Sequence, residues 1–261
     1  MPRSTRRKEA LPPTAPSSPQ ATSPSPPSAR RRASPERSPA RRRATARATA
    51  EVNRPREVWV ITGGAGHVGQ VLAARLHAEG HVVRMLDLTA PTSLQDGIQF
   101  VKGSVTNEGD VWRLLAGAEG GDCLPADVVV HLAGAGMSGR GMLDEALCNR
   151  VNVQGARIVT EHARRLAVFS SAQVRLIHMS SYNVCFHGQP VEGEDEDAPY
   201  SPPSAHTDFY GASKAEAERL VLASDGDAGG LLRTIALRPG AIFGESETRH
   251  VPRIVQLIKL G

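Results

Sequence analysis

The sequence predicts an α/β fold, a doubly wound parallel sheet with helices on both faces. Short apolar runs typical of buried strands alternate along residues 57–261 with segments whose apolar residues recur at helical spacing. A glycine-rich turn, Thr62–Gly69, joins the first apolar run to the first helical segment. Because crossovers between parallel strands are right-handed, this alternation favours the doubly wound order.

The expected strands cover residues 57–62, 81–87, 98–101, 127–132, 174–180 and 232–238. The expected helices cover residues 67–79, 110–116, 143–168 and 209–223, and a last helix starts near residue 250. The sequence stops in or just after that last helix, where a substrate-binding portion is expected to follow. We therefore interpret the chain as truncated before its C-terminal substrate region.

Residues 1–56 differ sharply in composition from the rest. They are rich in Pro, Ser, Ala and Arg and hold 14 Arg and Lys against 3 Glu. With hardly any large apolar residues, this tail cannot bury enough surface to offset its ordering entropy, so it is predicted to be disordered. Three interpretations stay open: an organelle transit peptide, an uncleaved low-complexity extension, or a segment that contacts nucleic acid or anionic lipid.

Residues 57–261 are predicted to form one nucleotide-binding domain, and they hold 17 basic and 24 acidic residues. This mildly acidic balance gives no support for a nucleic-acid partner of the domain. Cys123, Cys148 and Cys185 lie far apart, with no CxxC pattern, which argues against a disulfide framework or a structural zinc site and suits a reducing compartment. No metal site is expected, and no apolar run is long enough to span a membrane.

The glycine-rich turn predicts a dinucleotide site. Glycines between a strand and a helix permit a tight turn and let the backbone approach a pyrophosphate, which the helix N-terminus then binds. Asp87 follows Gly69 by about the offset of a ribose-binding carboxylate. Such a carboxylate accepts hydrogen bonds from the 2′-hydroxyl and repels a 2′-phosphate, so NAD is favoured over NADP as the cofactor.

Tyr210 and Lys214 are the second chemical signal. Residues four apart on a helix share a face, and a nearby ammonium favours the phenolate, so this Tyr can act as a general base on an alcohol. A solvated helical pair is the alternative. A hydroxyl within Met179–Val184, at the end of an expected strand, could donate to the substrate oxygen, with ordinary turn chemistry as the alternative for Ser180. Asn152 is unusual inside a helix, which indicates either a polar task or a buried structural amide.

These segments resemble the extended short-chain dehydrogenase/reductase superfamily from about residue 58 onward. The matching pieces, in order, are the glycine motif, Asp87, His131-Leu132-Ala133-Gly134, Asn152, Ser181, Tyr210 with Lys214, and Arg238-Pro239-Gly240. Three segments are similar to the 3β-hydroxysteroid dehydrogenase/isomerase branch, and within it to the less-characterised sterol-dehydrogenase-like members. These segments are Gly136–Arg140, Leu237–Gly244 and Arg249–Val255.

The resemblance implies a catalytic set of Ser181, Tyr210 and Lys214, supported by Asn152. It also implies oxidation of the 3β-hydroxyl of a steroid or sterol-like alcohol, with hydride passing to NAD. The expected cofactor contacts are Gly63, Gly66, His67, Val68, Gly69, Asp87, Ser104, Val105, Leu132, Ala133, Tyr210, Lys214 and Pro239. An intracellular location follows, either in an organelle reached through the tail or at the endoplasmic reticulum membrane through a C-terminal part.

The sequence departs from the family pattern at three places. Ser104-Val105 stands where family members usually carry an Asp before the apolar residue at the adenine, and Val184-Cys185-Phe186 stands where many extended members have Val-Tyr-Gly. The third departure is an acidic stretch, Glu192–Asp197, which is interpreted as a solvated surface loop rather than a metal site.

Alternatives to a sterol dehydrogenase remain at this stage. A nucleotide-sugar epimerase or dehydratase of the same superfamily would also use NAD, but would recycle it in place. Reductases of flavonol-like or aldehyde substrates are a further possibility. A non-catalytic nucleotide-binding fragment is the last alternative, because an unfinished sheet would leave apolar edges exposed.

Overall fold

The computed structural model describes residues 56–117, 124–189, 193–244 and 250–259. Contacts divide the chain into two units, Met1–Arg54 and Pro55–Gly261, and every described residue belongs to the second. The predictions for the basic tail therefore lie outside the described residues, except for Arg56. Cys123 and Glu192 lie outside them as well.

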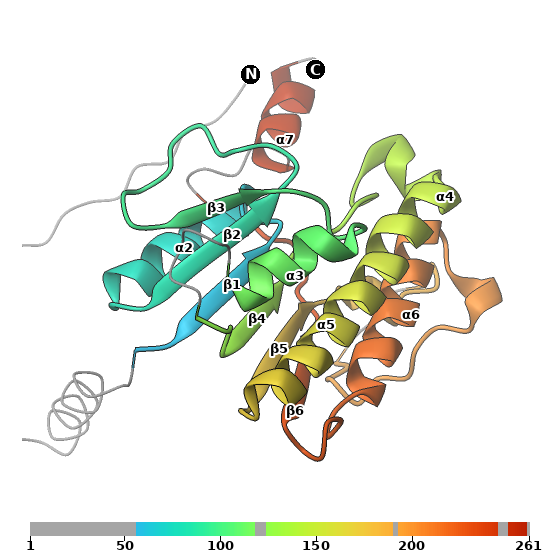
Figure 1. The fold of residues 1–261 in the computed structure, drawn as a ribbon. Coiled ribbons are helices and arrows are strands. Elements are labelled where there is room, and N and C mark those ends of the chain that lie inside the picture. The colour runs from blue at the N-terminus through green and yellow to red at the C-terminus, as the bar shows by residue number, and fades with distance from the viewer. Residues whose placement is uncertain (1–55, 118–123, 190–192, 245–249, 260–261) are drawn as a thin grey trace, which may run out of the picture. The chain divides into compact units, whose positions relative to one another are not determined.

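The second unit is built on a parallel sheet of six strands in the order β3-β2-β1-β4-β5-β6 (Figure 1). The strands are β1 (Val58–Thr62), β2 (Val82–Asp87), β3 (Gln99–Lys102), β4 (Val128–His131), β5 (Val174–Met179) and β6 (Leu232–Leu237). Each predicted strand is present, with ends that differ by one residue at most. The order reverses between β1 and β4, so the doubly wound prediction is confirmed.

Helices cover both faces of the sheet (Figure 1). Helix α2 (His67–Ala78) packs on β1 and β2, whereas α3 (Glu108–Ala116), α5 (Gly155–Ser170) and α6 (Phe209–Ala223) lie on the other face. A last helix, α7 (His250–Lys259), follows β6. Within the described part of the chain, no helix combines the length and the hydropathy needed to cross a membrane.

Each face of the sheet has its own core. On the α2 side, Ile61, Val83 and Met85 pack with Leu76. The larger core lies under α3, α5 and α6, where Val60, Val129 and Leu176 of the strands meet the helices. Its helical members include Val111, Leu114, Leu115, Val159, Leu166 and Val221. Alternate residues of each strand thus serve opposite cores, as a buried parallel sheet requires.

The helix predicted over residues 143–168 is wrong in its detail. The segment contains a 3₁₀ turn η1 (Gly139–Leu143), a short α4 (Glu145–Cys148), a π-helix η2 (Asn149–Gln154) and then α5. Apolar periodicity does not distinguish an α-helix from a π-turn, because one wider turn shifts the pattern by a single residue. Asn152 lies within this π-helix, and its side chain is buried.

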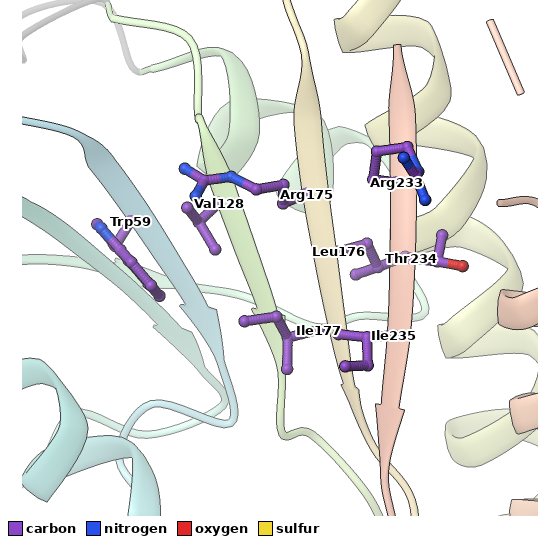
Figure 2. Close-up of a pocket in the computed structure, with 8 residues that line it drawn as sticks. All are labelled: Trp59, Val128, Arg175, Leu176, Ile177, Arg233, Thr234 and Ile235. Carbon is purple, nitrogen blue, oxygen red and sulfur yellow. The ribbon is translucent and has the colours of Figure 1, made fainter. Parts of the chain in front are cut away.

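The strands β4, β5 and β6 carry apolar side chains on the face opposite α5 and α6. Figure 2 shows Ile177 and Ile235 beside each other at a hollow of about 210 Å³, which also reaches Trp59 of β1. Arg175 and Arg233 line the same hollow nearer the amino ends of their strands. The hollow lies away from the carboxyl ends of the strands, where ligands bind in sheets of this type.

We predict that Leu114→Ala lowers the free energy of unfolding by about 2–5 kcal/mol, because Leu114 is fully buried in the larger core and its truncation leaves a cavity. Leu143→Ala, at a residue that is 66% exposed, is the matched control and should change it by less than about 0.5 kcal/mol. Urea unfolding followed by circular dichroism measures both, and equal effects would contradict the core assignment.

Candidate active site

The candidate site lies where parallel strands end together. The carboxyl ends of β1, β2, β4, β5 and β6 are Thr62, Asp87, His131, Met179 and Leu237. Backbone hydrogen bonds continue beyond the strands, from Ser180 N–H to the Leu237 carbonyl at 2.8 Å and from Tyr182 N–H to the Pro239 carbonyl at 3.2 Å. The loops after β5 and β6 are therefore held side by side.

The glycine-rich turn packs closely against the end of β4. Gly63 has φ +68°, and a Cβ placed on it would lie 2.7 Å from the Ala133 backbone nitrogen. A Cβ on Gly69 would lie 2.6 Å from the Gly64 carbonyl oxygen. Only glycine fits at these two positions, so the sequence motif is explained by close backbone packing as well as by ligand approach.

Helix α2 starts directly after this turn, with His67 and Val68 in its first turn. Gly66 is its N-cap residue and contributes no side-chain hydrogen bond. The first backbone N–H groups of a helix have no intrahelical partner and attract negative charge. The structure thus presents the predicted anion-binding end at the edge of the site.

Asp87 extends from the end of β2 towards the glycine turn. One carboxylate oxygen accepts the Ala65 N–H at 3.0 Å, and the other accepts the Leu88 N–H at 2.7 Å. The backbone carbonyl of Asp87 accepts the Gly103 N–H at 3.0 Å, which brings the end of β3 alongside. A carboxylate has about four lone-pair positions, so these two bonds leave capacity for a ligand hydroxyl.

The other predicted cofactor residues fall into two groups. Leu132 and Ala133 pack against the glycine turn. The Leu132 N–H donates to the Thr62 carbonyl at 3.1 Å, and the Ala133 N–H donates to Thr62 Oγ1 at 3.3 Å. Ser104 lies one residue past Gly103, and its hydroxyl pairs with Thr106 Oγ1 at 2.8 Å. Val105 is buried in the larger core, where a Cβ on Gly155 of α5 would meet it.

Asn152 joins three elements. Its Oδ1 accepts the Ala135 N–H at 2.8 Å, and its Nδ2 donates to the Ala135 carbonyl at 3.0 Å and to Ser213 Oγ at 2.9 Å. The amide is 1% exposed. Asn152 therefore fixes the loop after β4 against helix α6, which supports the interpretation of this residue as a buried structural amide. Gly134 of the same loop lies close to both side chains, since a Cβ placed on it would be 3.4 Å from Asn152 Oδ1 and from Lys214 Nζ.

Helix α6 brings Tyr210 and Lys214 to this place. Asp208 caps the helix by accepting the Gly211 N–H at 2.7 Å. Gly211 also allows close packing against η3 (Tyr182–Val184), because a Cβ on this residue would lie 3.2 Å from the Asn183 carbonyl oxygen. Tyr210 and Lys214 are 8% and 3% exposed. The alternative of a solvated helical pair is therefore wrong.

Lys214 donates from Nζ to the carbonyl of Met179, the last residue of β5, at 2.7 Å. Burial lowers the pKa of Lys214 from 10.5 to about 8, although the carboxylate of Glu218 raises it in part. Desolvation opposes the charged form of an ammonium, which is why burial acts in this direction. Lys214 thus carries a proton at neutral pH and releases it in mildly alkaline solution.

The two serines after β5 have different surroundings. Ser180 Oγ donates its hydroxyl proton to a hydrogen bond with the carboxylate of Glu218, so it has no further proton to donate to a substrate. Ser181 is 8% exposed, and its Oγ accepts the Asn183 N–H at 3.2 Å. An oxygen that accepts a hydrogen bond still has its own O–H to donate. Ser181 is therefore the better donor to a substrate oxygen.

Two histidines lie beside Lys214 on neighbouring strands. His131 and His178 pair in register across β4 and β5, with ring centroids 5.3 Å apart. Burial, and secondly the charge of Lys214, lowers the pKa of His131 to about 3, and the same causes lower that of His178. Both imidazoles are neutral at pH 7, so they add no positive charge beside the ammonium.

Three residues that hold the site together were not predicted from the sequence. Ser213 bonds Asn152, while Glu218 and Tyr200 belong to a buried network with Ser180. The position of Glu218, four residues after Lys214 on the same helix, was a signal that could have revealed it. Nothing in the sequence near Tyr200 indicated a role, because its partner lies 18 residues away.

The remaining departures from the family pattern meet at Arg238, the residue that follows β6. Cys185 Sγ accepts a hydrogen bond from Arg238 Nη1 at 3.4 Å and donates to the Ala198 carbonyl at 3.5 Å. Residues 193–197 of the acidic stretch are exposed, in agreement with a solvated loop. The Glu196 carbonyl of this loop also accepts from Arg238 Nη1, at 3.1 Å.

Residues 60–261 match the 3-beta hydroxysteroid dehydrogenase/isomerase family, and the chain belongs to this family. Mouse short-chain dehydrogenase/reductase family 42E member 1 is 40% identical over 212 residues, which are 79% of this chain and 51% of that protein. The decarboxylating sterol-4-alpha-carboxylate 3-dehydrogenase of Candida albicans is 34% identical, over 77% of this chain and 55% of its own length. The chain thus spans about half the length of these curated relatives.

Solved structures of similar fold include proteins with bound NAD. A short-chain dehydrogenase/reductase superfamily protein from Agrobacterium tumefaciens with bound NAD has 28% identity and a TM-score of 0.55, over 69% of this chain and 48% of that one. The Thermus thermophilus UDP-glucose 4-epimerase complex with NAD has 26% identity and a TM-score of 0.61, over 77% and 60%. The predicted family and fold are confirmed by these findings.

We predict that Gly63→Ala destabilises the protein by about 1–3 kcal/mol, because the added Cβ would collide with Ala133 at a backbone angle that alanine rarely adopts. Gly240→Ala is the control, since a Cβ there meets nothing within 4 Å. Thermal unfolding measures both variants. A Gly63→Ala protein as stable as the control would show that the turn does not need glycine here.

Proposed function

We propose that this chain forms the cofactor-binding and catalytic part of a dehydrogenase that oxidises the 3β-hydroxyl of a steroid or sterol, with NAD as the hydride acceptor. One observation carries the enzymatic part of this proposal. Lys214 is buried, hydrogen-bonded to the end of β5 and one helical turn after the buried Tyr210. A buried ammonium beside a buried phenol is an arrangement that supports proton transfer.

The residues at the glycine turn fit a dinucleotide. The close packing at Gly63 and Gly69 keeps side chains away from the start of α2, where a pyrophosphate would lie against backbone N–H groups. Gly66, His67 and Val68 line the same end of the helix, and Asp87 has acceptor capacity for a ribose hydroxyl. When bound, NAD supplies the acceptor for the hydride that leaves the carbinol carbon.

The chain's own residues would then handle the proton. Tyr210, as phenolate, accepts the proton of the substrate hydroxyl, while the Ser181 hydroxyl donates a hydrogen bond to the same oxygen. The charge of Lys214 favours the phenolate, and Asn152 keeps the loop after β4 in place. The products are a ketone, the reduced cofactor and a proton held on Tyr210.

The sterol class is supported by family membership and by the sterol-4-alpha-carboxylate 3-dehydrogenase relatives. A second candidate is a nucleotide-sugar epimerase, favoured by the likeness to the Thermus thermophilus UDP-glucose 4-epimerase. The two differ in the fate of the cofactor. A dehydrogenase releases NADH at each turnover, whereas an epimerase keeps and reoxidises it.

The test is to follow NADH fluorescence with the full-length protein, NAD and a panel of 3β-hydroxysterols and UDP-sugars. We expect NADH to accumulate with a 3β-hydroxysterol and not with a UDP-sugar. Epimerised UDP-sugar without net NADH would favour the second candidate, and turnover of neither class would reject both.

Tyr210→Phe should lower turnover by about 100-fold or more while NAD binding is retained, because only the acid–base group is removed. Tyr182→Phe, at a residue that is 50% exposed, is the control and should keep turnover. Stopped-flow turnover and fluorescence titration with NAD measure the two effects. Normal turnover of the Tyr210→Phe protein would exclude this residue as the base.

A further inference from the structure

Beneath the candidate site lies a buried network centred on Glu218, which the catalytic scheme does not use. Glu218 is 1% exposed, and one of its oxygens accepts from Ser180 Oγ. The other accepts from the Tyr200 hydroxyl at 2.9 Å and from Arg238, whose Nε and Nη2 lie at 2.9 and 2.8 Å. A carboxylate this deeply buried is stable only because charge and hydrogen bonds compensate it.

The network joins four parts of the chain. Glu218 belongs to α6, Ser180 follows β5, Arg238 follows β6, and Tyr200 belongs to the loop before α6. Arg238 is 14% exposed in its side chain and lies over the Tyr200 ring at 5.0 Å. The hydrogen bond to Glu218 is the main cause of a raised pKa at Arg238, so the guanidinium keeps its charge. One carboxylate thus connects the ends of β5 and β6 to helix α6.

Two features of the chain place this network next to the candidate catalytic residues. Ser180, which Glu218 holds, immediately precedes Ser181. Glu218 also lies one helical turn after Lys214, on the same face of α6. The other titratable groups near the ammonium are Tyr210 on α6 and the neutral His131 and His178 on β4 and β5. Beside these groups, Glu218 is the carboxylate whose charge raises the pKa of Lys214.

We propose that Glu218 is a positioning residue, which anchors the end of β5 to helix α6 and holds the positive charge of Lys214, and that Arg238 moderates this effect by sharing its carboxylate. The proposal deepens the proposed function, because it concerns the same Lys214. A neutral amide of the same shape still accepts hydrogen bonds through its one oxygen, so it replaces part of the structural anchor. It cannot replace the negative charge that stabilises the ammonium.

Lys214 can be observed without cofactor or substrate. The chain holds four lysines, Lys8, Lys102, Lys214 and Lys259. With ¹³C-labelled lysine, an NMR titration of the ε-carbons follows each amino group, and Lys214→Met assigns the signal of interest. Because this readout needs no turnover, the proposal can fail or succeed independently of the proposed function.

We expect Glu218→Gln to lower the titration midpoint of Lys214 by about one pH unit, since the nearby negative charge is lost while the size and shape of the side chain are kept. Arg238→Gln should move the midpoint the other way, to higher pH, because the carboxylate then acts on Lys214 without its partner. Arg238→Lys, which retains the charge, should stay close to the unmodified protein. Glu216→Gln, the same change at an exposed residue of α6, is the matched control and should leave the midpoint in place.

If Glu218→Gln does not fold, the pair Arg238→Gln and Arg238→Lys carries the test alone. A Lys214 midpoint that stays fixed in folded Glu218→Gln, or in folded Arg238→Gln, would overturn the proposal. If both midpoints shift as expected but no sterol is oxidised, the proposed function fails and the role of Glu218 stands.

Discussion

The candidate site depends on one buried ammonium. Lys214 is removed from water, and its hydrogen bond to the Met179 carbonyl places it where the central strands end. Desolvation alone would drive such a group towards its neutral form. The neighbouring carboxylate of Glu218 opposes this, and the two neutral imidazoles of His131 and His178 do not add to the repulsion. Lys214 therefore keeps at neutral pH the positive charge that would favour the phenolate form of Tyr210, because the groups around it compensate part of the desolvation.

The fold was predictable because it is set by local patterns. Apolar runs of strand length, a glycine turn and helical periodicity each act over a few residues, and parallel strands leave few ways to connect them. The predicted strands of β1 to β6 and the helix at residues 209–223 follow from these patterns. The positions of Tyr210, Lys214 and Asp87 were predictable for the same reason. The spacing of two of them along one helix, and the place of the third at the end of a strand, determine where they lie.

What the sequence did not reveal depends on contacts between distant segments. The π-helix at residues 149–154 is formed where Asn152 turns inward to bond Ala135 and Ser213, the latter 61 positions away. The difference between Ser180 and Ser181 is set by Glu218, which lies on another element. Periodicity carries no information on such pairings, so the local pattern alone could not assign different tasks to the two adjacent serines, and only the family resemblance distinguished Ser181.

The π-helix also constrains how this part of the chain can vary in length. A π-turn holds one residue more than an α-turn, and each residue of an α-helix advances the chain by about 100° around the axis. Deleting one residue from 149–154 would let the α-helix run on from α4 into α5 in nearly the same phase, but would remove the wider turn in which Asn152 bonds Ala135 and Ser213. Insertions and deletions are therefore less tolerable here than in the stretch 193–197, whose residues are exposed.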